Sequence, residues 1–139
     1  MYSSILVPVD LSVEANTDAL LGKAKTLAEA WGSEVHVASV IPEMGMAIVG
    51  SHFGANHEAE ARAAVTQQLS ARLEAVGLNA QTHVMTGTIY DKVIALAAQL
   101  KVDLIVIGAH RPELKDYLLG SNAARVVRHS SASVLVVRD

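Results

Sequence analysis

Short apolar runs of four to six residues recur along the chain. They are rich in branched side chains, and most are nearly continuous in apolar character. Runs of this kind are typical of strands that are buried on both faces of a parallel sheet. We therefore predict four strands and a weaker fifth, at residues 5–9, 35–40, 104–107 and 134–137, and at residues 81–85.

The stretches between these runs carry a helical pattern, because their apolar residues recur at steps of three and four. Gly32 and Gly77 follow two of these stretches and are predicted helix ends, since glycine readily adopts the left-handed conformation that terminates a helix. Thr88 and Asp91 have the spacing of a capping box at the start of a third helix. The predicted helices cover residues 12–31, 58–76 and 88–100 and a last segment that begins at residue 118 or 121 and ends at 129.

Strands and helices thus alternate along the whole chain. This alternation predicts an α/β fold, with a parallel sheet covered by helices on both faces, and 139 residues fit one domain over residues 1–139. Right-handed crossovers leave few topologies, of which we expect the five-stranded order 3-2-1-4-5. In such sheets ligands bind beyond the carboxyl ends of the strands where the strand order reverses, here between the first and fourth strands. The two strand ends, near Asp10 and Gly108, should therefore face one crevice.

Residues 42–56 break the regular pattern. The segment contains three glycines, two methionines and a phenylalanine. It is long for a connection inside a compact domain. We predict a mobile loop that borders the crevice, and both a functional lid and a disordered excursion are compatible with its composition.

Composition excludes several function classes. The formal net charge is −3, so the chain lacks the basic footprint of a nucleic-acid binder. There is no cysteine, and the six histidines have no metal-ligand spacing, so we expect no disulfide and no metal site of the protein's own. No apolar run approaches the length that spans a bilayer and no signal peptide is evident, so we expect a soluble, cytoplasmic protein.

The most informative stretch runs from Gly108 to Asn122. A buried strand ends at Gly108, and Gly120, Ser121 and Asn122 stand at the start of a helix. Glycine allows a ligand to approach the backbone, and the first N–H groups of a helix lack internal partners and carry partial positive charge. Together these features predict a phosphate site, although serine or asparagine at a helix start is also an ordinary cap.

Several motifs in the same order resemble the universal stress protein family over the whole chain. The likeness is strongest to its small bacterial F- and G-type members. The matching segments are Ile5-Leu6-Val7-Pro8-Val9-Asp10, Thr86-Gly87-Thr88, Gly108-Ala109-His110-Arg111, Leu118-Leu119-Gly120-Ser121-Asn122, Val126-Val127-Arg128-His129 and Val134-Leu135-Val136-Val137.

This resemblance implies a Rossmann-like domain of the adenine nucleotide α-hydrolase type that binds ATP, with Mg²⁺ or Mn²⁺ as a possible companion. Adenine and ribose would lie near Asp10 and Val40, and the phosphates against the glycine loop and the helix start. Asp10 could accept from a ribose hydroxyl or hold Mg²⁺ through water, and its alternative role is to cap the first helix. The candidate nucleotide-binding residues are Pro8, Val9, Asp10, Val40, Gly87, Ile107, Gly108, His110, Arg111, Gly120, Ser121 and Asn122.

One departure from the family's ATP signature lies in the loop. Gly108 and Gly120 are separated by eleven residues, one fewer than the signature has, and Arg111 stands where its middle glycine is expected. The arginine could obstruct the phosphate path or contact a phosphate oxygen with its planar set of donors. Because the F-type members share this loop, we expect binding to be retained.

The leading hypothesis is a regulatory or stress-tolerance protein that binds ATP. No base is placed to activate water and no Walker lysine is present, so we expect no catalytic residue and at most slow ATP hydrolysis. The last strand, residues 133–138, should be a sheet edge that pairs two copies into a homodimer, with a tetramer also open. Two alternatives remain: an oligomeric interaction module that binds no nucleotide, and a small hydrolase or transferase that uses the same crevice.

Overall fold

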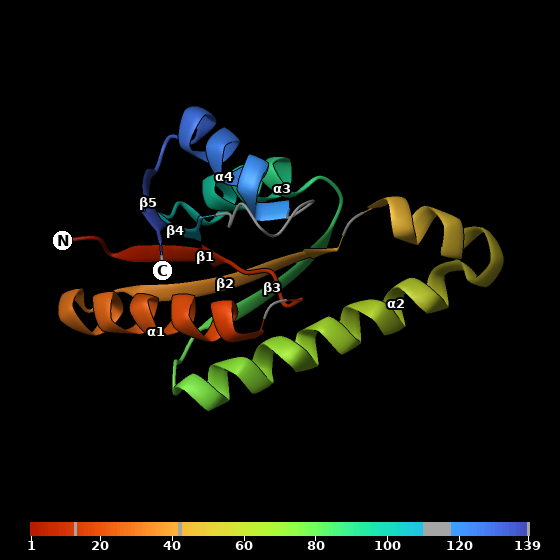
Figure 1. The fold of residues 1–139 in the computed structure, drawn as a ribbon, viewed down its shortest axis with the longest axis horizontal. Coiled ribbons are helices and arrows are strands. Elements are labelled where there is room, and N and C mark those ends of the chain that lie inside the picture. The colour runs from red at the N-terminus through yellow and green to blue at the C-terminus, as the bar shows by residue number, and fades with distance from the viewer. Residues whose placement is uncertain (13, 42, 110–117, 139) are drawn as a thin grey trace.

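A computed structural model describes residues 1–12, 14–41, 43–109 and 118–138, with residues 43–57 and 118–121 described by their backbone alone. Strands and helices alternate strictly along the described chain, as expected (Figure 1). The elements are β1 (Ser4–Pro8), α1 (Glu14–Trp31), β2 (Glu34–Ile41), α2 (Glu43–Val76), β3 (Gln81–Thr86), α3 (Ile89–Leu100), β4 (Leu104–Gly108), α4 (Leu118–His129) and β5 (Ser133–Val137).

The five strands form one parallel sheet in the order β3-β2-β1-β4-β5, which confirms the predicted fold and topology. Helices α1 and α2 lie on one face of the sheet and α3 and α4 on the other (Figure 1). The strand order reverses at β1, whose neighbours are β2 and β4. All strands run in the same direction, so the carboxyl ends of β1, β2 and β4 meet at one edge of the sheet.

The core has two layers because successive residues of a buried strand point to opposite faces. Val7 and Leu69 belong to the layer under α1 and α2, and both side chains are fully buried. Leu6, Ile105 and Val126 belong to the layer under α3 and α4 and are likewise fully buried. This double burial explains why the strands are continuously apolar in sequence.

Both predicted glycine helix ends are confirmed. Gly32 follows α1 with a φ of 66°, and Gly77 follows α2 with a φ of 76°. Ser33 N donates to the Ala28 carbonyl at 3.0 Å, and Gly77 N donates to the Leu73 carbonyl at 2.8 Å. Backbone donors beyond the helices therefore satisfy carbonyls of the last turns, in the manner of C-terminal capping motifs.

The prediction of a loop at residues 42–56 is wrong. The backbone is helical from residue 43 onward, so that α2 is 34 residues long. Each glycine disfavours a helix by about 1 kcal/mol relative to alanine, but residues 43–76 contain no proline and helix extension adds one hydrogen bond per residue. Figure 1 shows α2 extending past the carboxyl ends of the strands and changing direction within its first half.

The predicted capping box at Thr88 and Asp91 is also wrong. Thr88 occupies the N-cap position of α3 with extended backbone angles, but its side chain makes no capping hydrogen bond. The acceptor comes from α4 instead, since Tyr90 N donates to Asn122 Oδ1 at 2.9 Å. A side chain from a neighbouring helix has thus replaced a local cap, which sequence spacing alone cannot reveal.

Asp103 ties β1 to β4 at the amino ends of the strands. Its Oδ2 accepts from the Ser3 backbone N–H at 3.0 Å, and its Oδ1 accepts from the Ser4 N–H at 3.0 Å. These backbone N–H groups, Ser3 first and then Ser4, hold the pKa of Asp103 below its ordinary value, because hydrogen bonds to a carboxylate favour the charged form. The carboxylate is therefore part of what fixes the strand register.

A pair of imidazoles joins β2 to the edge strand β3. His36 Nδ1 and His83 Nε2 are 3.0 Å apart, and only 4% of the His36 surface is exposed. Burial, and then the charge of the neighbouring His36 ring, lower the pKa of His83 below its ordinary value of 6.5. The folded state therefore disfavours a positive charge on His83.

This pair predicts a pH dependence of stability. Because the pKa of His83 is lower in the folded state, the unfolded state binds more protons as the pH falls below about 6.5, and folding weakens. We expect the free energy of unfolding to fall by at most about 1.4 kcal/mol per pH unit from this one group. Urea denaturation between about pH 7 and about pH 5 measures it.

His83→Gln should flatten this pH dependence, and His129→Gln should not, because His129 is an exposed residue at the end of α4. An unchanged slope in His83→Gln would assign the pH dependence to other groups.

Candidate functional site

A hollow opens at the carboxyl edge of the sheet, where β1 and β2 end. The hollow is shallow: it encloses only about 30 Å³, and it spans about 300 Å³ when the open space at its mouth is included. It contains four of the predicted binding residues, Pro8, Val9, Asp10 and Val40, and it is the site at which the strand order reverses. Its lining residues are Pro8, Val9, Asp10, Ala38, Ser39, Val40 and Ile89.

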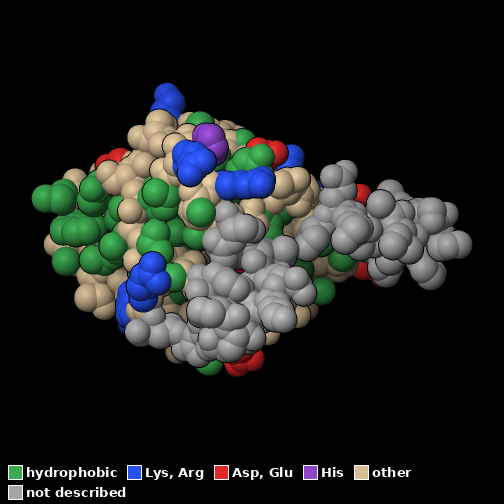
Figure 2. Space-filling view, turned by 45° about the horizontal axis from the view of Figure 1, so that its top comes forward, with side chains coloured by type: hydrophobic (Ala, Val, Ile, Leu, Met, Phe, Trp, Pro, Cys, Tyr) green, Lys and Arg blue, Asp and Glu red, His purple; other side chains and the backbone are tan. Residues whose placement is uncertain are grey.

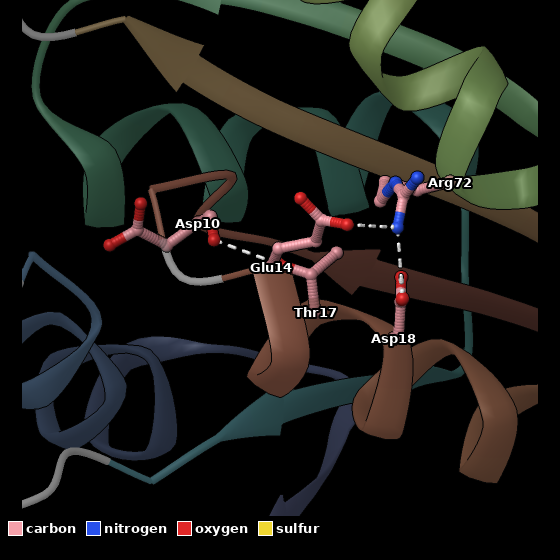
Figure 3. Close-up of polar contacts among 5 residues, drawn as sticks. All are labelled: Asp10, Glu14, Thr17, Asp18 and Arg72. Carbon is pink, nitrogen blue, oxygen red and sulfur yellow. Dashed lines mark hydrogen bonds and ion pairs between the residues drawn. The ribbon is translucent and has the colours of Figure 1, made fainter.

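Asp10 organises the turn between β1 and α1. Its Oδ1 accepts from the Ser12 backbone N–H at 3.0 Å and from the Ser12 hydroxyl at 2.6 Å. Its backbone carbonyl accepts from the Thr17 hydroxyl at 2.8 Å (Figure 3). The carboxylate therefore orders the turn that precedes α1, and one of its oxygens suffices for this. Among the described contacts it accepts from no backbone N–H of α1, so they do not show the alternative role of a helix cap.

The direction of the Asp10 carboxylate leaves a second role open. In Figure 3 the carboxylate points away from Thr17 and from Arg72. Since the residue also lines the hollow, its carboxylate stands at the edge where a ligand would bind. Among the described contacts only Oδ1 of the carboxylate accepts hydrogen bonds, and Oδ2 accepts none.

Arg72 of α2 was not identified from the sequence. Its guanidinium donates to Glu14 Oε1 at 2.7 Å and to Asp18 Oδ2 at 3.0 Å, so it ties α2 to the beginning of α1 (Figure 3). Arg72 is partly buried, whereas Glu14 is largely exposed. The contact positions the helix that follows Asp10, and the 54 residues between Asp18 and Arg72 explain why no local pattern indicated it.

Two glycines of the predicted site, Gly87 and Gly108, differ in whether the backbone requires glycine at their position. Gly87 has a φ of 140°, and an added Cβ would lie 2.7 Å from Lys92 Cε, so the backbone itself favours glycine there. Gly108 lacks such a constraint, since among the described residues its added Cβ would meet only Leu20 Cδ2 at 3.9 Å. Packing among the described residues therefore does not require a glycine at the end of β4, and glycine there would allow a ligand to approach closely.

Ile107 is fully buried in the core. Its side chain is therefore not available to a ligand, and any contact would have to use its backbone.

Helix α4 begins at Leu118, so Gly120 and Ser121 lie in its first turn and Asn122 follows. Only a few residues connect the end of α4 to the start of β5, so the first turn of α4 lies toward the carboxyl edge of the sheet. Asn122 reaches the start of α3 through Tyr90, the residue after Ile89 of the hollow. The start of α4 and the Asp10 hollow therefore lie at the same edge of the sheet.

Two predicted binding residues, His110 and Arg111, lie outside the described residues. Within the described ranges, no group of three or more histidine, aspartate or glutamate side chains is placed to hold a metal ion. In the same part of the chain, no helix combines the length and the apolar character needed to cross a membrane.

The last strand lies at an edge of the sheet, as expected, and exposes apolar side chains. Leu135 of β5 is 40% exposed and Val127 of α4 is 52% exposed. Figure 2 shows hydrophobic side chains at the left end of this view, the end at which the N-terminus lies in Figure 1, with Lys and Arg in separate patches. A groove between α4 and β5 is lined by Ala109, Ala123, Ala124, Val127, Arg128, Val136 and Arg138.

Comparison with known proteins gives a consistent result. The model of the "Universal stress protein family" matches residues 1–138. Universal stress protein G of Salmonella typhimurium is 35% identical over 148 residues, which cover 99% of this chain and all of that protein.

Among solved structures, a universal stress protein of Methanocaldococcus jannaschii has a TM-score of 0.80 at 26% identity, covering 100% of this chain and 97% of that one. A universal stress protein in complex with cAMP has the same fold, with a TM-score of 0.68 at 23% identity and coverage of 99% and 97%. The chain belongs to the universal stress protein family.

Proposed function

We propose that this protein binds an adenine nucleotide, with ATP as the leading ligand, and serves a regulatory or stress-tolerance role. The observation that carries the proposal is the convergence of two features at one edge of the sheet. One is the hollow that Asp10 lines, and the other is the first turn of α4 with Gly120 and Ser121. Clefts at the reversal point of an open parallel sheet are where such folds bind ligands.

Each part of a nucleotide has a chemical partner at this edge. The apolar Val9 and Val40 suit a base, and the Asp10 carboxylate suits a ribose hydroxyl or, through water, Mg²⁺ or Mn²⁺. The N–H groups of the first turn of α4, which lack partners within the helix, and the helix dipole suit the phosphates. Gly108 supports the proposal because its lack of a side chain has no other explanation among the described contacts.

Known relatives support an adenine nucleotide over other ligands. One structure of the same fold is a universal stress protein in complex with cAMP. The family resemblance around Gly108 and Gly120 points to ATP. We propose no dedicated enzymatic activity beyond slow ATP hydrolysis. We also propose a cytoplasmic location, because ATP is available in that compartment.

We also propose that the protein is a homodimer through residues 133–138. Leu135 and Val127 are apolar and exposed, and an exposed edge strand pairs readily with another chain. At the opposite edge, Arg62 of α2 donates to the Val84 carbonyl at 3.1 Å and so occupies a backbone acceptor of β3. The same exposed surface favours the second candidate function, an oligomeric interaction module without nucleotide.

Thermal unfolding with and without ligand tests nucleotide binding. At about 100 times Kd, ATP with Mg²⁺ should stabilise the protein by about 2.7 kcal/mol, since it binds only the folded state. For a domain of this size the melting temperature should rise by roughly 10 °C. The shifts in melting temperature with ADP, AMP and cAMP show how much each phosphate contributes to binding. The shift with GTP shows whether the site selects adenine over guanine.

The interaction module would be favoured by the opposite result. In that case no adenine nucleotide shifts the melting temperature, and no nucleotide co-purifies with the protein.

A further inference from the structure

We propose that Asn122 is a positioning residue that caps α3 and thereby couples the first turn of α4 to the Asp10 hollow, rather than a phosphate ligand. The coupling to ligand binding rests on the proposed function. The cap itself does not, because it is a contact within the protein.

The cap follows from the hydrogen bonds at the start of α3. The first N–H groups of a helix have no internal partner and are normally satisfied by the residue that precedes the helix. Thr88 stands at that place, but its side chain makes no capping hydrogen bond. Tyr90 N, two positions later, donates to Asn122 Oδ1 at 2.9 Å across 32 residues of sequence. The N-terminal cap of α3 is therefore supplied by α4.

Two further contacts join the same turns of the two helices. Arg125, three residues after Asn122, places its guanidinium carbon 4.8 Å from the centre of the Tyr90 ring. Ile89 and Ala123, the neighbours of Tyr90 and Asn122 in sequence, are 8% and 6% exposed and belong to the same core layer. A hydrogen bond, a cation–π contact and apolar packing thus hold the two helix starts together.

The coupling arises because this joint lies between the two halves of the site. Ile89 lines the hollow beside Asp10, and Gly120 and Ser121 lie just before Asn122. Holding both helix starts in one arrangement lowers the ordering cost of binding a ligand that contacts both. Loss of the Asn122 acceptor should therefore weaken binding of the adenosine part, although Asn122 does not itself line the hollow.

Adenosine, which has no phosphate, distinguishes a positioning residue from a phosphate ligand. Asn122→Ala should weaken adenosine binding by about tenfold, comparable to the loss of one hydrogen bond. Asn122→Asp keeps an oxygen acceptor, and its charge is favourable at the start of α3, so it should restore adenosine binding to near the wild-type affinity. Calorimetric titration measures both affinities.

The nucleotide-free protein gives an independent measurement. Hydrogen exchange of the Tyr90 amide, followed by NMR, should be about tenfold faster in Asn122→Ala and near the wild-type rate in Asn122→Asp. Asn79→Ala serves as the control, because Asn79 is exposed in the turn after α2 and should change neither measurement.

The outcomes separate the two proposals. If the Tyr90 amide exchanges at the same rate in Asn122→Ala and wild type, the cap is absent and the inference is wrong. If Asn122→Ala weakens ATP but not adenosine, Asn122 is a phosphate ligand and the coupling is wrong. If wild type binds no nucleotide while Tyr90 behaves as expected, the proposed function fails and the cap stands.

Discussion

Gly120→Val should abolish the thermal protection expected from ATP under the proposed function, while the protein stays folded and keeps the proposed dimer. Gly120 lies in the first turn of α4, where N–H groups without helical partners are available to a phosphate. A branched side chain on this turn holds the ligand away from the backbone. At about 100 times the wild-type Kd, about 2.7 kcal/mol of ligand stabilisation should disappear. Melting with and without ATP measures the loss, and sedimentation measures the mass.

The matched control is Gly22→Val in α1. Gly22 is also a helical glycine, and an added Cβ would meet nothing within 4 Å among the described residues. This variant should keep the full response to ATP. If ATP protects Gly120→Val as well as wild type, the phosphates do not approach α4. If Gly120→Val loses its dimer together with its ATP response, the nucleotide site and the oligomer cannot be treated as separate functions.

Ile105→Ala should cost about 4 kcal/mol of folding free energy, a large part of the stability of a domain of this size. Ile105 is fully buried in β4, where it pairs with Leu6 of β1 on one side and with Val134 of β5 on the other. Truncation leaves a cavity that strands held by backbone hydrogen bonds on both sides cannot close. Urea denaturation measures the loss as a lower midpoint at unchanged slope.

Ile105→Val should cost only about 1 kcal/mol, because it removes a single methylene group. Equal losses in the two variants, or no loss in Ile105→Ala, would contradict the burial of Ile105 beneath α3 and α4.

Much of the fold could be predicted because its signals are local. The runs around Ile5 and Leu104 are apolar without interruption, which reflects burial on both faces of a parallel sheet. Gly32 and Gly77 end helices as expected, because glycine readily adopts the left-handed conformation that terminates a helix and needs no distant partner to do so. With alternating strands and helices, right-handed crossovers then restrict the sheet to few orders.

The errors arose where the partner of a residue is distant in sequence or where weak preferences compete. At residues 42–56 three glycines indicated a loop, but their cost did not stop the helix of α2. The Thr88 cap failed because Asn122 of α4 supplies the acceptor for Tyr90. Arg72 went unnoticed because its carboxylate partners lie on α1.

The candidate site also has features that the sequence determined and features that only the tertiary structure decided. By itself the sequence determined the alternating elements, the strand ends at Asp10 and Gly108 and the family, because these depend on periodicity and on motifs contiguous in the chain. Only the tertiary structure decided that Ile107 is inside the core, that Oδ1 of Asp10 holds Ser12, and that Asn122 reaches α3. Those results depend on which side chains meet across the sheet and between helices, and that is settled by packing rather than by local preference.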